Sequence, residues 1–386
     1  MIIKAVSKKG YHEKQAAIVV CTGSADMPSG FAHFLEHKMF EDPDLNMFEE
    51  FTQLGASVNA YTNFTHTVYY FNTIDNFYEN LELLFRLVKT PNFTEENVEK
   101  EKGIVLSEID MYADNPYWQV YTGLHKALFS TSPLRHEILG TKESVQSIRP
   151  ENLYENYNRF YKPDNMALIC VGDLEQEQIS EFTSRQKFGL RSNGGRASIP
   201  HNTGAGDEPA QVSTDFYEQR MAVSMPLFQL GFKALYSGLV EPVTLAASSI
   251  LADMLAGESS EVYVELYEQG MIDNQFTAEY IGGTYYGIFM FAGTSSNPEA
   301  VKERILNTEL DESRFEVIKN KHIGRFIRSM NSIDTICGAQ ADLITKGQTI
   351  ESMLEAFHKV SLSDVRQQKM NYLRPEKCAL SVISPI

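Results

Sequence analysis

Cysteine is scarce in this chain of 386 residues, and its few cysteines are scattered. They are Cys21, Cys170, Cys337 and Cys378, and no two stand at the close spacing of a metal-binding pair. Disulfide scaffolds are short and rich in cysteine, so this class of protein is excluded. We therefore expect four reduced thiols, typical of an intracellular protein, and no cysteine among any metal ligands.

Long apolar runs are also missing. No segment approaches the roughly eighteen consecutive apolar residues that a membrane-spanning helix requires. Residues 1–21 contain a basic stretch and only a short apolar run, which is typical of a first strand and not of a signal peptide. The sequence therefore predicts a soluble, cytoplasmic protein without a membrane span.

Basic residues are fewer than acidic residues. The chain has 34 Lys and Arg against 51 Asp and Glu, which gives a formal net charge of −17 at pH 7. This balance argues against a nucleic-acid partner and favours cationic or neutral partners. The length is enough for two domains with substantial cores.

The feature with the most chemical content is the pentapeptide His33-Phe34-Leu35-Glu36-His37. Residues four apart lie on one face of a helix, so both imidazoles could bind one zinc ion while Glu36 points at a metal-bound water. The order His-x-x-Glu-His is the inverted form of the commoner His-Glu-x-x-His and defines the inverzincin class. The alternative is a pair of ordinary histidines with hydrogen-bond partners.

A third ligand is needed, because catalytic zinc usually takes three protein ligands. Residues 94–116 read as a long helix that begins with Thr94 as its N-cap. Within it, Glu101 and Glu108 lie seven residues apart and therefore on one face. Glu108 follows the apolar run 104–106, where a carboxylate is costly unless it is paired or bound to metal. The other acids of this helix read as a solvated face.

These motifs resemble those of the pitrilysin and insulinase family of zinc metallopeptidases, and within it the small processing-peptidase-like members. The resemblance rests on HFLEH with the preceding Pro28–Ala32, Gly55–Thr62, Glu101–Ile109, Ile138–Ser144 and Val171–Asp173. It covers most of the chain, and the order of the motifs is specific.

The resemblance implies a set of roles. The zinc (Zn2+) ligands would be His33, His37 and Glu108, and Glu36 would be the general base. Glu101 would orient a ligand through a hydrogen bond.

A substrate strand is also implied. Residues 57–71 are rich in β-branched and aromatic residues and read as one strand. In similar peptidases an extended peptide lies along this edge strand, and Asn59 and Ala60 occupy the contact positions. An ordinary structural strand is the alternative for any one of these residues.

The two halves of the chain are related. Residues 161–171 resemble residues 373–383 at a constant offset of 212, which we interpret as an internal repeat of a helix followed by a strand. Residues 191–210 are rich in Gly, Ser, Asn and Pro and read as a linker. The predicted domains are therefore a zinc-binding catalytic domain at 1–190 and a homologous non-catalytic domain at 211–386.

Each half mixes amphipathic helices with strands. The expected helices include 77–89 and 242–255, and the expected strands include 166–171 and 285–291. This pattern predicts an α+β fold of two homologous domains, each a mostly antiparallel sheet covered by helices. By resemblance, the domains would face each other across a closed cleft.

One departure from the family stands in the second half. Members that work as single chains or homo-oligomers carry an Arg and a Tyr, seven residues apart, that hold the substrate and the developing oxyanion. Aligning Gly270 with the glycine of that motif places Leu266 and Asp273 there, and neither is an equivalent donor. Tyr285 and Tyr286 are possible substitutes, although packing within a strand is the other interpretation.

Three interpretations follow. The first is a zinc endopeptidase subunit that cleaves small peptides or leader peptides and pairs with a homologous chain supplying Arg and Tyr. Related bacterial pairs remove leaders from modified peptide bacteriocins. The second is a zinc-binding scaffold or core-type subunit with little activity of its own, against which the intact Glu36 argues. The third is an unrelated globular protein with incidental histidines.

Overall fold

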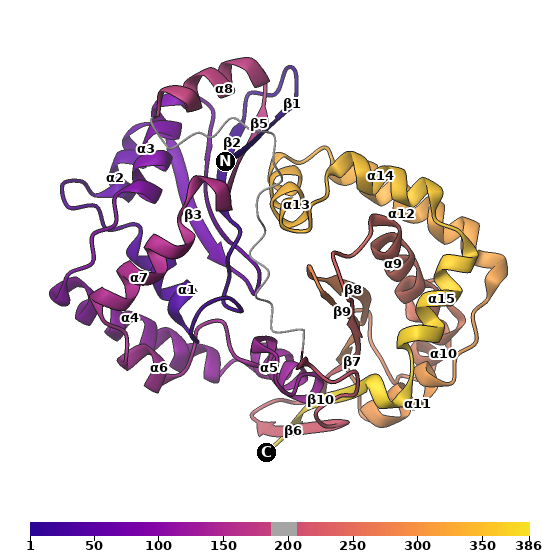
Figure 1. The fold of residues 1–386 in the computed structure, drawn as a ribbon. Coiled ribbons are helices and arrows are strands. Elements are labelled where there is room, and N and C mark those ends of the chain that lie inside the picture. The colour runs from indigo at the N-terminus through magenta and orange to yellow at the C-terminus, as the bar shows by residue number, and fades with distance from the viewer. Residues whose placement is uncertain (187–206) are drawn as a thin grey trace. The chain divides into compact units, whose positions relative to one another are not determined.

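The computed structural model describes residues 1–186 and 207–386, which form two compact units (Figure 1). Of the described residues, unit 1 contains Met1–Ile109, 137–186 and Ser329–Thr349, and unit 2 contains Asp110–His136, 207–328 and Ile350–Ile386. Most of the predicted linker, 191–210, lies outside the described residues.

Each unit is built around a five-stranded sheet. In unit 1 the order is β1-β5-β2-β4-β3, with bounds β1 (Ile2–Ser7), β2 (Lys14–Val20), β3 (Ala56–Thr62), β4 (Thr67–Thr73) and β5 (Met166–Gly172). In unit 2 the order is β6-β10-β7-β9-β8, with bounds β6 (Phe216–Met221), β7 (Leu227–Leu235), β8 (Thr277–Gly282), β9 (Tyr286–Thr294) and β10 (Cys378–Pro385).

The two sheets have the same topology. β1 pairs with β5 in parallel, as β6 does with β10, and the other neighbours pair antiparallel. The predicted repeat corresponds to the connection into β5 and the connection into β10. The expected fold class, two homologous halves with mostly antiparallel sheets and helices, is confirmed.

Helices surround both sheets. Those of unit 1 are α1 (Phe31–Lys38), α2 (Met47–Gln53), α3 (Phe77–Lys89), α4 (Glu95–Ala113, ending just past the unit boundary), α6 (Lys142–Gln146), α7 (Pro150–Phe160), α8 (Gln176–Arg185) and α13 (Ile333–Thr345). Those of unit 2 are α5 (Pro116–Leu128), α9 (Pro242–Ala256), α10 (Glu261–Glu268), α11 (Pro298–Leu306), α12 (Phe315–Ser329), α14 (Ile350–Lys359) and α15 (Leu362–Tyr372). The expected helices at 77–89, 94–116 and 242–255 all form.

Two helices are exchanged between the halves of the sequence. α5, from the first half, packs on β6, β7 and β10, whereas α13, from the second half, packs on β2 and β5. The expected division of the chain at 191–210 did not include this exchange. One face of each sheet is therefore covered by a helix from the other half of the sequence.

The prediction of one strand over 57–71 is wrong. The segment is a hairpin in which β3 and β4 pair antiparallel, with Thr62 opposite Thr67. Asn63 reverses the chain, because its side-chain Oδ1 accepts hydrogen bonds from the backbone N–H groups of Thr65 and His66, both at 2.8 Å. The hairpin makes β3 an edge strand of the sheet.

Side chains that alternate along the strands of unit 1 point to the two opposite faces of the sheet. Ala16, Ile18 and Val20 of β2 pack into the main apolar core together with residues of α1, α3 and α4. Gln15 and Ala17 point to the opposite face, where they line a pocket with residues of α13. Helices that carry the site residues therefore lie on one face of this sheet, and α13 lies on the other.

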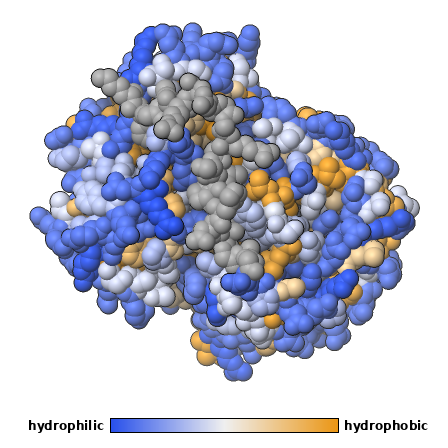
Figure 2. Space-filling view, in the orientation of Figure 1, coloured by the Kyte–Doolittle hydropathy of each residue, from blue (hydrophilic) through white to orange (hydrophobic). Residues whose placement is uncertain are grey.

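The exterior agrees with the composition. The face of the molecule in Figure 2 is mostly hydrophilic, with apolar residues in small groups. None of the helices in the described residues is long and apolar enough to cross a membrane. The four cysteines, all within the described part of the chain, are buried free thiols, as expected.

A buried ion pair anchors unit 2. Lys233 of β7 donates to Glu208 at 2.8 Å, and both side chains are fully buried. Glu208 also accepts hydrogen bonds from the backbone N–H groups of residues 130–132, which follow α5. Burial raises the pKa of Glu208, but Lys233 and these N–H groups outweigh it and lower the pKa from 4.5 to about 2.

Glu208→Ala is expected to lower the free energy of unfolding by about 3–5 kcal/mol, because it leaves the Lys233 charge buried without its partner. Denaturant titration would measure the loss. Glu268→Ala, at an exposed position on α10, is the control and should change little. Since the pKa of Glu208 is depressed on folding, its contribution is complete above pH 4.5 and disappears as the pH falls toward about 2. A wild-type chain and a Glu208→Ala chain with equal stability at pH 7 would contradict the prediction.

Candidate metal centre

The helix α1 carries His33, Glu36 and His37. It begins after Gly30, whose φ of 84° favours glycine. A Cβ on Gly140 would lie 2.7 Å from the Gly30 Cα, so close approach of two glycines seats the start of α1 against residues 139–144. Phe34 and Leu35 are fully buried and fix the opposite face of the helix in the core.

The helix α4 supplies the two carboxylates. Its apolar positions Val98 and Val105 are fully buried, seven residues apart. Glu101 and Glu108 repeat with the same spacing, so both lie along one side of the helix. The predicted long helix therefore places both acids where α4 passes α1.

The three side chains that the resemblance implies as ligands lie close together. Nε2 of His33 lies 3.6 Å from Oε2 of Glu108, and Nε2 of His37 lies 3.7 Å from the same oxygen. Candidate ligand atoms of His33, His37 and Glu108 all lie within 4.8 Å of one another. Together they offer three ligand atoms, one from each residue. Three is the number of protein ligands typical of a catalytic zinc site.

The fit to zinc can be tested against these distances. Ligand atoms about 2.0–2.2 Å from a tetrahedral zinc ion lie roughly 3.3–3.6 Å apart. The two nitrogen–oxygen distances, 3.6 and 3.7 Å, are close to that range. Two imidazoles and one carboxylate are also ligands that zinc accepts. The residues present therefore fit a zinc ion.

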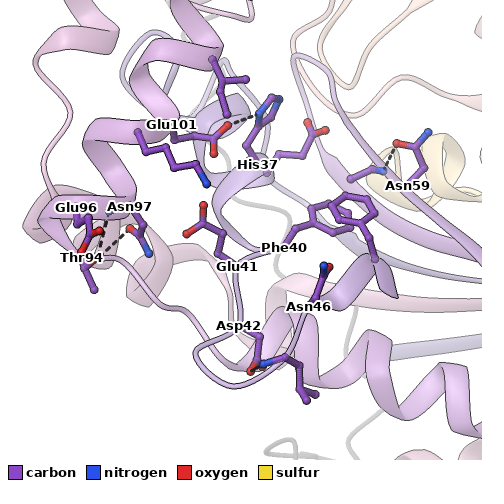
Figure 3. A pocket seen from close by; sticks show the side chains of 16 residues that line it. His37, Phe40, Glu41, Asp42, Asn46, Asn59, Thr94, Glu96, Asn97 and Glu101 are labelled. Atoms are coloured by element: carbon purple, nitrogen blue, oxygen red, sulfur yellow. Dashed lines mark hydrogen bonds and ion pairs between the residues drawn. The ribbon is translucent and has the colours of Figure 1, made fainter. Parts of the chain in front are cut away.

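The two histidines are held differently. Nδ1 of His37 lies 2.9 Å from Oε1 of Glu101 (Figure 3). This bond keeps a proton on Nδ1 and turns the lone pair of Nε2 toward Glu108. Burial lowers the pKa of His37, but Glu101, together with the charges of Glu36 and Glu108, outweighs burial, so the pKa is raised. His33 is held by packing, since its buried Nδ1 has no hydrogen-bond partner within the described ranges.

Burial also keeps His33 neutral. It lowers the pKa of His33 to about 3, with a further contribution from the nearby His37. A neutral imidazole is the form that binds metal. Burial raises the pKa of Glu108 as well, and a bound cation would stabilise its charged form.

Glu36 stands beside this cluster. Its Oε2 accepts a hydrogen bond from the Thr62 hydroxyl at 2.6 Å. Burial raises the pKa of Glu36 to about 6, and the Thr62 bond opposes that shift. A carboxyl whose pKa is raised toward neutrality suits a general base.

A pocket of about 740 Å³ opens next to the cluster (Figure 3). It is lined by Glu36, His37 and Glu101, and by Asn59 and Ala60 from β3. Both predicted substrate-contact residues therefore lie on an edge strand that borders this pocket. An unpaired edge can accept an extended peptide through backbone hydrogen bonds.

The two second-half positions singled out in the sequence, Leu266 and Asp273, lie in unit 2. Leu266 is buried in α10. Asp273 accepts hydrogen bonds from the Thr294 hydroxyl and the Gln275 backbone N–H. Tyr286 is buried at the start of β9 with its ring edge-on to Phe129, as the packing interpretation expects.

Sequence reasoning missed two residues that support the site. Thr62 ends the segment Gly55–Thr62, on which the family resemblance partly rests, yet its contact with Glu36 depends on how β3 meets α1. Lys38 follows His37, is fully buried, and donates to the backbone carbonyl oxygen of Asn97 in α4 at 3.1 Å. In the sequence, the only sign of the contact between Lys38 and Asn97 was a lysine on an otherwise apolar helix face.

Comparison with known proteins gives a consistent result. The model of the insulinase family (Peptidase family M16) matches residues 4–142, and that of the Peptidase M16 inactive domain matches residues 147–315. A Bacillus subtilis (strain 168) protein named uncharacterized zinc protease YmfH is 30% identical, over 98% of this chain and 93% of that protein. The mitochondrial-processing peptidase subunit beta of Dictyostelium discoideum is 22% identical, over 100% and 87%. A crystal structure described as an M16-like peptidase, from Alicyclobacillus acidocaldarius, has a TM-score of 0.89 at 27% identity and covers 100% of this chain and 96% of that chain.

Proposed function

The chain belongs to the insulinase family of peptidases, family M16, and from this premise we propose that it is a zinc-dependent endopeptidase subunit. Its substrates would be small peptides or leader peptides in the cytoplasm, a compartment that suits four free thiols. The observation that carries the proposal is the convergence of His33, His37 and Glu108 beside the buried carboxyl of Glu36.

In this proposal, His33, His37 and Glu108 hold the zinc ion. When bound, zinc supplies Lewis-acid activation of the scissile carbonyl and of the attacking water. Glu36 takes a proton from that water as the new C–O bond forms, and delivers it to the leaving amine as the C–N bond breaks. Glu101 keeps His37 oriented, and Thr62 holds one oxygen of Glu36.

The substrate would lie along β3. β3 is at the edge of its sheet, and the backbone N–H of Ala60 donates to the side-chain oxygen of its neighbour Asn59 at 2.8 Å. Backbone groups on such a free edge can bind an extended peptide without demanding a side-chain sequence.

We expect activity to depend on a second, related chain. Leu266 and Asp273 stand where the family places its oxyanion and substrate donors, and losing one such donor costs about 10²–10³ in rate. Addition of a homologous partner bearing Arg and Tyr should therefore raise peptide hydrolysis by about that factor. The measurement is cleavage of unstructured peptides by the zinc-loaded chain, alone and with the partner.

The control is a partner with its Arg and Tyr replaced, which should still form the complex but not restore activity. Full activity of this chain alone, at concentrations where it is monomeric, would disprove the dependence. It would direct attention to Asn59, Tyr285 and Tyr286 as donors.

The second candidate function is a zinc-binding scaffold. The match of residues 147–315 to the inactive-domain model favours it, whereas the intact Glu36 opposes it. Zinc bound without hydrolysis in any partner combination would support the scaffold. Cleavage that requires zinc and is abolished by a chelator would support the peptidase.

A further inference from the structure

The strand β3 has two faces, and only one of them borders the metal centre. Val58 and Ala60 pack against the main core, and Thr62 bonds to Glu36, so these alternate side chains face the metal side. Ser57, Asn59 and Tyr61 therefore point to the opposite face. On that side of the sheet, α13, the helix contributed by the second half of the sequence, packs on β2 and β5.

A second pocket, of about 400 Å³, lies on this opposite face. Ser57, Asn59 and Tyr61 form its β3 wall, residues of β2 and β4 form its floor, and the first turns of α13 form its other wall. It is therefore open to an occupant bound along the free edge of β3.

Two polar groups of this pocket can accept hydrogen bonds from a cation. Asp334, in the first turn of α13, accepts a hydrogen bond from the Asn72 side chain at 2.7 Å, and a carboxylate can accept several more. Gln15 is only 4% exposed, and its side-chain oxygen Oε1 has no hydrogen-bond partner anywhere in the described residues. None of the described residues that line the pocket is Lys or Arg.

A buried acceptor without a donor is costly, whereas Asp334 is exposed and available to pair with an incoming cation. A lysine or arginine side chain has this chemistry. Its apolar stem would contact Val68 and Ala341, and its charged end would pair with Asp334. The chain's net charge of −17 also favours a cationic ligand.

We propose that this pocket is a specificity subsite, which binds a Lys or Arg side chain of a peptide that lies along β3. The inference rests on the proposed peptidase function, because it takes β3 as the substrate strand. Successive side chains of an extended peptide point to opposite faces. Alternate residues of the substrate then face the metal side, and those between them face Asp334 and Gln15.

A lysine scan tests this subsite. A single Lys is moved along an otherwise neutral, fluorescently labelled peptide, and each Kd is measured on the zinc-loaded Glu36→Gln chain, which binds without cutting. Lys should tighten binding by about tenfold relative to Gln at a position on the α13 face, and not at the positions directly before and after it.

Asp334→Asn should abolish the gain from Lys, because it removes the charge while keeping an oxygen for Asn72. Asp75→Asn is the matched control, since Asp75 is an exposed acid of unit 1 outside the pocket lining, and it should retain the gain. Thermal unfolding of both variants checks that α13 remains folded.

Several results would overturn the subsite. One is a gain from Lys that persists in Asp334→Asn, and another is equal binding of the Lys and Gln peptides at every position. If the neutral peptide is still cleaved by the unsubstituted chain with its partner, only the subsite fails. If no peptide binds, the substrate strand and the subsite fail together. Tighter binding of an apolar residue than of Lys would also reject the cationic assignment.

Discussion

Glu36→Gln is expected to retain zinc and to lose about 10²–10⁴-fold in peptide hydrolysis. The substitution keeps the size of the side chain and an oxygen that can accept the Thr62 hydrogen bond. It removes the carboxylate that takes the proton, and an amide cannot replace it. Since Glu36 is not among the converging ligand atoms, the zinc content should stay at that of the unsubstituted chain.

The measurement combines metal analysis with single-turnover cleavage in the presence of the partner. Glu96→Gln is the control, because Glu96 is exposed and lines the same pocket from the first turn of α4. It makes the same chemical change without touching the base and should cleave at close to the normal rate. Undiminished turnover by Glu36→Gln would reject the mechanism.

His33→Ala and Glu108→Ala are each expected to empty the site, from about one zinc per chain to almost none, because each removes one of three protein ligands. Glu101→Gln should have a smaller effect, about 10–100-fold in zinc affinity, since Glu101 acts through its hydrogen bond to His37. Elemental analysis of the dialysed proteins measures occupancy, and competition with a chelator measures affinity.

Glu95→Ala is the control for the acid substitutions, because Glu95 is exposed at the start of the same helix. Thermal unfolding of the variants should show that the fold remains, since the core positions of α1 and α4 are untouched. Full zinc occupancy in Glu108→Ala would remove Glu108 from the ligand set and indicate Glu101 in its place.

The two pairs of candidate site residues could be predicted because their spacing is local, and the resemblance implied the choice of Glu108 as third ligand. His33 and His37 share a helix face for geometric reasons that hold in any environment, and the same is true of Glu101 and Glu108. That α1 and α4 pack together was inferred from the family resemblance, since helix periodicity does not specify which helices meet. The structure brings the predicted residues within bonding range of one ion, and their roles stay predictions until zinc is measured.

The hairpin at 56–73 shows where propensity fails. β-branched and aromatic residues continue through both strands, so the composition of 57–71 indicates a strand without indicating where it turns. The turn depends on one side chain, Asn63, which bonds to the backbone two and three residues ahead. This turn makes β3 an edge strand and brings Thr62 to Glu36.

By itself, the sequence determined what repeats along the chain: the helix periods, the spacing of the zinc motif, and the resemblance of 161–171 to 373–383. Only the tertiary structure decided which distant segments lie together. It placed α5 on the second sheet and α13 on the first, and so created the pocket between β3 and Asp334. The physical reason is that helix and strand periods are local properties, whereas the partner of an apolar face is chosen by burial and shape across the whole chain.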